Sequence, residues 1–157
     1  MSQAFEILVA EFAAAKGLQA EPGSYALEFE SEDHQVVVMP HPARQDHLMV
    51  EVSVAALGQD GLGEDLAPLL LQINEAARFE HEWSIFMDTR MEVTLGTCLA
   101  SSGLSLAEME GLIVDGLDRA RALRDLLQAQ TQQLMGDDAA QAALEVPAGE
   151  PAGLLRG

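Results

Sequence analysis

Few side chains in this 157-residue sequence are of types that catalyse reactions or bind metals; they comprise four histidines and one cysteine. His41 and His47 flank a short loop, and Asp46 directly precedes His47, so a metal site at this loop is one hypothesis. A structural zinc site, however, needs four ligands at close spacing, commonly with paired cysteines. Because the chain has a single cysteine, we expect solvated loop histidines and no metal site.

Cys98 lies in an alternating strand pattern between Thr97 and Leu99. A nucleophilic cysteine needs a nearby base and a lowered pKa, whereas a cysteine among apolar strand residues is usually a small core residue. We expect the core role for Cys98. The sequence also lacks a G-x-G-x-x-G loop, a Walker-type loop and a serine nucleophile elbow. It therefore predicts neither a cofactor nor a catalytic residue, and we expect no enzymatic activity.

The charge balance narrows the classes of partner. Asp and Glu number 26 against 8 Lys and Arg, which gives a formal net charge of -18. Such a surface repels nucleic-acid phosphates and anionic membranes, and it keeps a protein with exposed apolar patches in solution. The N-terminus has no basic segment of a secretory signal, no apolar run matches a membrane span, and a single cysteine fits a reducing compartment. We expect a cytoplasmic protein that binds no nucleic acid and does not insert into membranes.

Apolar periodicity predicts the elements that must position any functional side chain. Helical spacing predicts three helices, near residues 3–16, 66–77 and 105–136. Alternating patterns, and one apolar run that ends at Pro40, predict five strands, near residues 25–30, 36–40, 48–54, 83–87 and 91–99. Ser105 and Glu108 form a capping box that starts the last helix, and Gly136 is expected to end it.

This pattern predicts an α+β fold in the order α-β-β-β-α-β-β-α, with an antiparallel sheet packed against helices. We expect residues 1–135 to form this single domain. Residues 136–157 are rich in Ala, Gly and Pro and have no sustained period, so we expect a flexible acidic tail.

The predicted strands carry apolar side chains on both faces. Four of these point away from the main apolar face of their own strand: Val37, Met39, Met49 and Phe86. If helices cover one face of the sheet, these four side chains lie on the other. Contiguous exposed apolar groups usually mark a binding site, and methionine adapts to varied partners. Alternatively, a second layer such as another subunit covers them, and one face can serve both purposes.

The stretch from Leu69 to Asp88, LLLQINEAARFEHEWSIFMD, joins the second helix to the fourth strand. It begins with a leucine pair, Leu69 and Leu70, which Asn74 follows closely. It ends with an apolar strand pattern, Trp83 to Asp88, that terminates in aspartate.

With the element order, the acidity and the Gly17-Leu18 pair after the first helix, this stretch resembles the class I type III secretion chaperones, also called the Tir chaperone family. The resemblance spans roughly residues 4–134. The chain departs from the family at residues 79–83, FEHEW, where glycine is usual near the start of the fourth strand. The YbjN-like proteins have a similar fold and are the alternative: a regulatory or assembly module without a secreted client.

The resemblance implies a cytoplasmic homodimer of a Gram-negative bacterium, formed largely through the second helix and the adjoining strand. It implies that the dimer binds a segment near the N-terminus of one or more secreted effector proteins in extended form, which keeps the effector soluble and competent for secretion. It also allows binding to the export ATPase. Added strand pairing would supply affinity through main-chain hydrogen bonds, and apolar grooves would supply selectivity.

Carried onto this sequence, the resemblance assigns two sets of candidate residues. The dimer-interface candidates are Leu69, Leu70, Ile73, Asn74, Ile85 and Phe86. The effector-binding candidates are Leu8, Phe12, Val37, Met39 and Met49. A core position is the open alternative for the leucines and Ile73 of the second helix, and equally for Leu8 and Phe12, because the first helix must bury its apolar stripe. Asn74 would bond either to the backbone or to its counterpart in the second subunit, as a polar group that fixes register.

Overall fold

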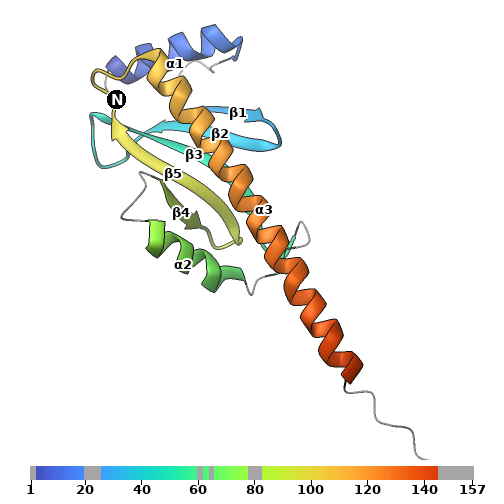
Figure 1. The fold of residues 1–157 in the computed structure, drawn as a ribbon. Helices are drawn as coiled ribbons and strands as arrows, with labels where there is room; N and C mark the ends of the chain where they lie inside the picture. Colours follow the sequence, from blue (N-terminus) through green and yellow to red (C-terminus); the bar gives the residue numbers. More distant parts are fainter. Residues whose placement is uncertain (1–2, 20–25, 60–61, 64–65, 78–82, 145–157) are drawn as a thin grey trace, which may run out of the picture.

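The computed structural model describes residues 3–19, 26–59, 62–63, 66–77 and 83–144. Its elements follow one another in the predicted order (Figure 1). They are α1 (Gln3–Lys16), β1 (Leu27–Ser31), β2 (His34–Pro40), β3 (His47–Ala56), α2 (Ala67–Ala77), β4 (Ser84–Met87), β5 (Glu92–Ala100) and α3 (Leu106–Leu144). The predicted α+β class is therefore confirmed.

Some residues used in the sequence analysis lie outside the described part of the chain. They are residue 25 of the first predicted strand, residues 79–82 of the segment FEHEW, and residues 145–157.

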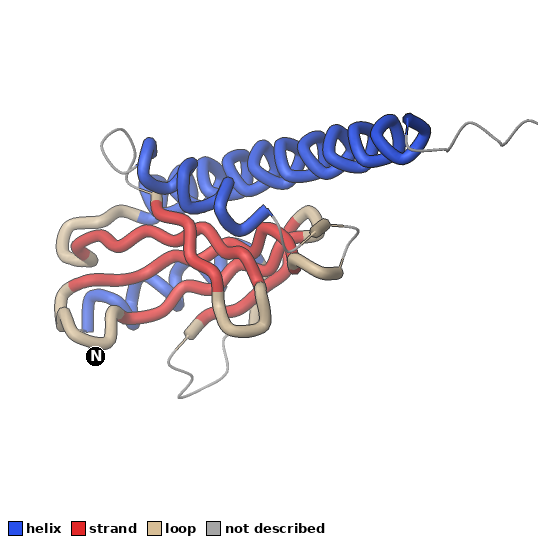
Figure 2. Tube along the Cα trace, turned by 90° about the horizontal axis from the view of Figure 1, so that it is seen from below, coloured by secondary structure: helices blue, strands red, loops and turns tan. Residues whose placement is uncertain are grey.

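The five strands form one antiparallel sheet in the order β1-β2-β3-β5-β4, so β1 and β4 are its edges. Successive side chains of a strand point to opposite faces. On one face the β3 side chains of Leu48, Val50, Val52 and Val54 are completely buried. Figure 2 shows α2 and α3 together on one side of the sheet. These residues and the helices above them form the hydrophobic core.

The opposite face, which we call the open face, carries the alternate side chains of the same strands. In its centre these are Gln35, Val37 and Met39 of β2, Met49, Glu51 and Ser53 of β3, and Thr94, Gly96 and Cys98 of β5. At its edges they are Glu28 and Glu30 of β1 and Phe86 of β4. Most of these residues are half-buried or exposed. The predicted apolar second face therefore exists.

The long helix α3 crosses the sheet diagonally (Figure 1) and packs mainly on β3. Its buried side chains recur every three or four residues, as predicted: Met109, Ile113, Leu117, Ala120, Leu123 and Leu127. The predicted capping box is present, because the Ser105 N–H donates to Glu108 Oε2 at 2.8 Å and the Glu108 N–H donates to Ser105 Oγ at 3.3 Å. This cap fixes the point at which α3 begins.

The prediction that Gly136 ends the last helix is wrong, because α3 continues to Leu144. Glycine inside a helix costs about 1 kcal/mol relative to alanine. The segment that follows, DDAAQAAL, holds four alanines, the residue type with the highest helix propensity. One glycine in such a sequence does not end a helix. Residues 136–144, which we assigned to the tail, are therefore helical.

Candidate partner-binding surfaces

Two histidines, His34 and His41, have local structural roles. Nδ1 of the buried His34 lies 2.6 Å from the carbonyl oxygen of Ser53. Nδ1 of His41 accepts the N–H groups of Ala43 and Arg44 at 3.0 and 3.1 Å. Within the described ranges, no group of three or more His, Cys, Asp or Glu side chains is placed to hold a metal ion.

The expectation that Cys98 is a core residue is wrong. Val93, Leu95 and Thr97 of β5 point toward the helices and are buried. Because the period of a strand is two residues, Cys98 points the other way, and its side chain is exposed on the open face. There it lies beside Met49 in the register of β3 and β5.

Apolar side chains form a strip across the open face. Met39, Met49 and Cys98 stand in one row over β2, β3 and β5, and Val37 lies two residues before Met39 on β2. Val37, Met39 and Met49 are each half-buried. These three effector-binding candidates therefore lie together at a surface, as their alternation predicts.

Glu51 stands next to this strip, in register with Val37 on β2 and Gly96 on β5. The ring of Phe86 lies over Gly96: a methyl group built there would lie 2.7 Å from Phe86 Cε2. Burial raises the pKa of the Glu51 carboxyl above its usual value of 4.5. The carboxyl group therefore lies in a partly desolvated trough between apolar groups.

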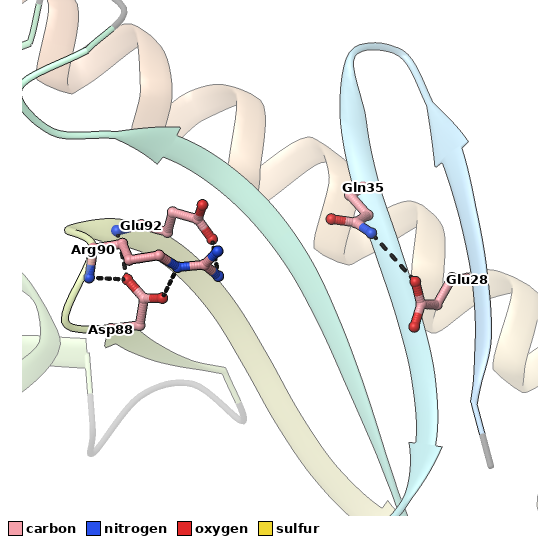
Figure 3. Close-up of polar contacts among 5 residues, drawn as sticks. All are labelled: Glu28, Gln35, Asp88, Arg90 and Glu92. Atoms are coloured by element: carbon pink, nitrogen blue, oxygen red, sulfur yellow. Dashed lines mark hydrogen bonds and ion pairs between the residues drawn. The ribbon is translucent and has the colours of Figure 1, made fainter.

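Polar contacts surround the strip on two sides. Figure 3 shows them on the side of the sheet away from α3. On β1 and β2, Gln35 Nε2 donates to Glu28 at 3.5 Å. In the β4–β5 turn, Arg90 Nε lies 3.1 Å from Asp88 Oδ2, and Arg90 Nη2 lies 3.2 Å from Glu92 Oε2. Asp88 Oδ1 also accepts the N–H of Glu92, and this bond and those to Arg90 lower the pKa of Asp88.

The joint between α2 and β4 contains the asparagine singled out in the sequence. Asn74 Oδ1 accepts the N–H of Ile85 at 2.8 Å. Of the two expected partners, Asn74 therefore bonds to backbone. The bond ties α2 to β4 and occupies one N–H of an edge strand, which limits strand addition there.

The dimer-interface candidates on α2 differ in exposure. Leu70 is 3% exposed and belongs to the core, so the core alternative holds for this residue. Leu69 and Ile73 are half-buried. Leu71, which is not among the sequence-predicted interface residues, is 69% exposed, and Phe86 on β4 is 50% exposed. The third leucine of the LLL run is thus the most exposed of the three.

An apolar groove of about 260 Å³ lies where α2, β4 and α3 meet. Its apolar lining comes from Ile73, Trp83, Ile85, Leu95, Ala122, Leu123 and Leu126. Trp83 is buried, and its Nε1–H donates to Asp115 Oδ2 at 2.8 Å. Asp115 also pairs with Arg119 at 2.8 Å. This network fixes the start of β4 on α3.

Leu8 and Phe12 on α1 lie in the hydrophobic core, at 5% and 2% exposure. The Phe12 ring packs against Phe29 of β1, with ring centroids 5.8 Å apart. The apolar stripe of α1 is used to cover the sheet, so neither side chain offers surface to a partner. Of the effector-binding candidates, only the three on the sheet are accessible.

A comparison with protein-family models finds no match, and neither does a comparison with curated protein sequences. Solved structures do share the fold. A chain of the ExsC–ExsE complex matches with a TM-score of 0.64 and 24% identity, over 81% of this chain and 97% of that chain. A chain of the HopA1–SchA chaperone–effector complex matches with a TM-score of 0.62 and 12% identity, over 78% and 94%.

A chain from the complex of the Yersinia pestis type III secretion chaperone SycH with a stable fragment of YscM2 matches with a TM-score of 0.54 and 17% identity, over 74% of this chain and 96% of that chain. This chain has the class I type III secretion chaperone fold. The chaperone fold is nearly complete here, because the match covers at least 94% of each of the three solved chains. Within the described part of the chain, no helix is both long enough and apolar enough to cross a membrane.

Proposed function

We propose that this protein is a cytoplasmic type III secretion chaperone of a Gram-negative bacterium. It binds a segment near the N-terminus of one or more effector proteins in extended form, and so keeps the effector soluble and competent for secretion. The fold shared with chains of chaperone complexes supports this proposal. The role needs binding alone and no catalysis.

The observation that carries the proposal is the apolar strip of the open face. Val37, Met39 and Met49 have apolar side chains, which folding normally buries. Here they lie only half-buried on a sheet face of a protein with a net charge of -18. Exposed apolar groups that adjoin one another usually mark a binding surface. Methionine side chains repack around different partners, which suits a chaperone that serves varied sequences.

The edge strand β1 offers a second mode of contact. The turn that follows β1 has two residues with positive φ, Glu32 at 52° and Asp33 at 66°, and Ser31 pairs with His34 across it. In such a hairpin every second residue of β1 directs its N–H and C=O outward, and here these are Glu28 and Glu30. An added client strand would bond to these groups, because main-chain pairing at a sheet edge accepts many sequences.

The proposed chaperone is a homodimer joined through α2 and β4. Leu69 and Ile73 of α2 contribute to this interface, and Ile85 and Phe86 flank it. Leu71 joins the set because its side chain is 69% exposed. Binding to the export ATPase stays a prediction of the resemblance.

The alternative was a YbjN-like regulatory or assembly module without a secreted client. Two of the three structures described above are named as chaperone complexes, and none is named as a YbjN-like protein. The chaperone function is therefore the one that we retain.

Co-purification tests the proposal. Candidate effectors encoded beside the gene are co-expressed with the tagged protein, both in full length and without their first ~100 residues, a length that can wrap a small dimer when extended. We expect only the full-length effector to co-purify. Retention of the shortened effector at an equal level would contradict the proposed binding mode.

A matched pair of variants locates the surface. Met49→Glu places a charge in the apolar strip and is expected to reduce effector recovery at least about tenfold, because an unpaired charge is buried on binding. Val114→Glu introduces the same charge at a 57% exposed position of α3 and is expected to leave recovery unchanged. Circular dichroism serves as the control that both variants are folded.

A further inference from the structure

The centre of the open face holds a carboxylate between two hollows. One hollow, of about 350 Å³, is lined in part by Val37, Ser53 and Thr94. The other, of about 390 Å³, is lined in part by Met49, Phe86 and Thr94. Glu51 lines both. A segment that crosses the open face from one hollow to the other therefore passes over Glu51.

Within the part of the chain that the structure describes, no hydrogen bond or ion pair holds the Glu51 carboxylate. The other charged groups around the two hollows are paired. Asp88 and Glu92 both contact Arg90, and Arg124 of α3 donates its Nε–H to the carbonyl oxygen of Val54 at 2.7 Å. Glu51 thus differs from its acidic neighbours in lacking a cation.

The surroundings of Glu51 favour one class of side chain in a segment bound to the open face. Val37 and Gly96 flank it in register, and the Phe86 ring covers Gly96. An apolar or neutral segment laid over this position would remove water from the carboxylate without replacing its hydrogen bonds, which is costly. A Lys or Arg side chain would replace them, and an Arg could also stack on the Phe86 ring.

We infer that Glu51 selects a basic side chain, Lys or Arg, flanked by apolar residues in the extended segment that binds the open face. This inference rests on the proposed chaperone function and names the sequence class of its client. Charge complementarity supports it, because the whole chain has 26 acidic and 8 basic residues and its open face is bordered by Glu28, Glu30 and Glu92. An acidic client residue at this position is rejected by the same carboxylate.

Synthetic peptides test the selection directly. An array carries peptides of about 15 residues, roughly 50 Å when extended, in which valine and serine alternate around one central residue. The central residue is Arg, Lys, citrulline, Val or Glu; citrulline has the shape of arginine without its charge. The full-length protein is the analyte. We expect the Arg and Lys peptides to bind about tenfold more tightly than the citrulline peptide.

Variants assign the preference to a residue. Glu51→Gln is expected to bind the Arg and citrulline peptides equally, and Glu51→Lys to prefer the Glu peptide. Glu11→Gln, at an exposed position of α1 away from the open face, is the control that keeps the Arg preference. Reversal by a charge swap is not expected of a variant that is merely damaged in folding.

The outcomes separate this inference from the proposed function. If all peptides bind the wild-type protein equally, or if Glu51→Gln keeps the Arg preference, the inference is overturned and the chaperone function stands. If no peptide binds the wild-type protein, the inference is overturned as well, and a Met49→Glu variant that keeps full effector recovery shows in addition that the open face is not the client surface. The proposed function fails on a different result, namely that no full-length effector co-purifies with the wild-type protein.

Discussion

At the scale of single residues, Gly116 on α3 makes room for the indole of Trp83. A methyl group built at Gly116 would lie 2.5 Å from Trp83 Cη2 and 2.9 Å from Cζ2. The indole is buried and hydrogen-bonded to Asp115, so it cannot move aside freely. Gly116→Ala is therefore expected to lower the free energy of unfolding by about 1–3 kcal/mol through overpacking. Urea unfolding followed by the fluorescence of Trp83, the single tryptophan, measures the change.

Gly111 provides the control on the same helix, because a methyl group built there meets nothing within 4 Å. Gly111→Ala is expected to raise the free energy of unfolding by up to about 1 kcal/mol, since alanine favours the helix. If both substitutions raise the free energy of unfolding, the indole of Trp83 does not restrict the size of the side chain at position 116.

Strands and helices differ in how closely the sequence can assign a side chain to a face. A strand has two faces, so alternation alone puts Val37 and Met49 opposite the core. A helix buries a stripe at least 100° wide, and each residue rotates by about 100°. Helical spacing places Leu69 and Leu70 on one apolar stripe of α2 and leaves Leu71 off it. It does not tell which residue of the stripe is fully buried, because the crossing geometry of α2 decides it. That geometry buries Leu70 and exposes Leu71.

At the scale of elements, the capping box makes a testable contribution to α3. Ser105 Oγ accepts the N–H of Glu108, and its hydroxyl donates to Glu108 Oε2 at 2.7 Å. Ser105→Ala removes both bonds and is expected to lower the free energy of unfolding by about 1 kcal/mol. Ser102→Ala, at an exposed position just before the cap, should leave the free energy of unfolding unchanged. Urea unfolding followed by Trp83 fluorescence measures both variants.

The same cap has a defined pH dependence. Hydrogen bonds from the hydroxyl and the N–H of Ser105 lower the pKa of Glu108 below 4.5. A lowered carboxyl pKa stabilises the folded state above the unfolded-state value, and this stabilisation is lost as the pH falls through the folded-state value. The difference in Tm between the wild type and Glu108→Gln should therefore be full at pH 7 and shrink below about pH 4.5. A difference that grows on acidification would contradict this assignment.

The order of elements was predictable because each has its own period and boundary residues. Alternation defined β3, and Ser105 with Glu108 defined the start of α3. The end of α3 was not predictable from Gly136, since alanines on one side outweigh a single glycine. The trough around Glu51 was also not predictable from the sequence, because it depends on the Phe86 ring of β4 lying over Gly96 of β5.

At the scale of the whole molecule, the net charge of -18 and the exposed apolar groups act together. Leu71, Phe86 and Met87 are 69%, 50% and 41% exposed, and they lie on α2 and the edge strand β4, which contact each other. Repulsion between acidic surfaces opposes random association, so only a surface with enough apolar contact can hold two copies together. The α2–β4 surface is the one we propose for the dimer.

Leu71→Glu tests the dimer without disturbing the core. Light scattering on the wild type should give about twice 16.8 kDa, and the variant should give a folded monomer, because the dimer would bury an unpaired charge. Leu70→Glu, one residue earlier, should instead unfold the chain, since Leu70 is 3% exposed. Val114→Glu on α3 should remain dimeric. A wild-type protein that is monomeric at all concentrations would contradict the dimer. A Leu71→Glu variant that stays dimeric would show that the subunits contact each other through another surface.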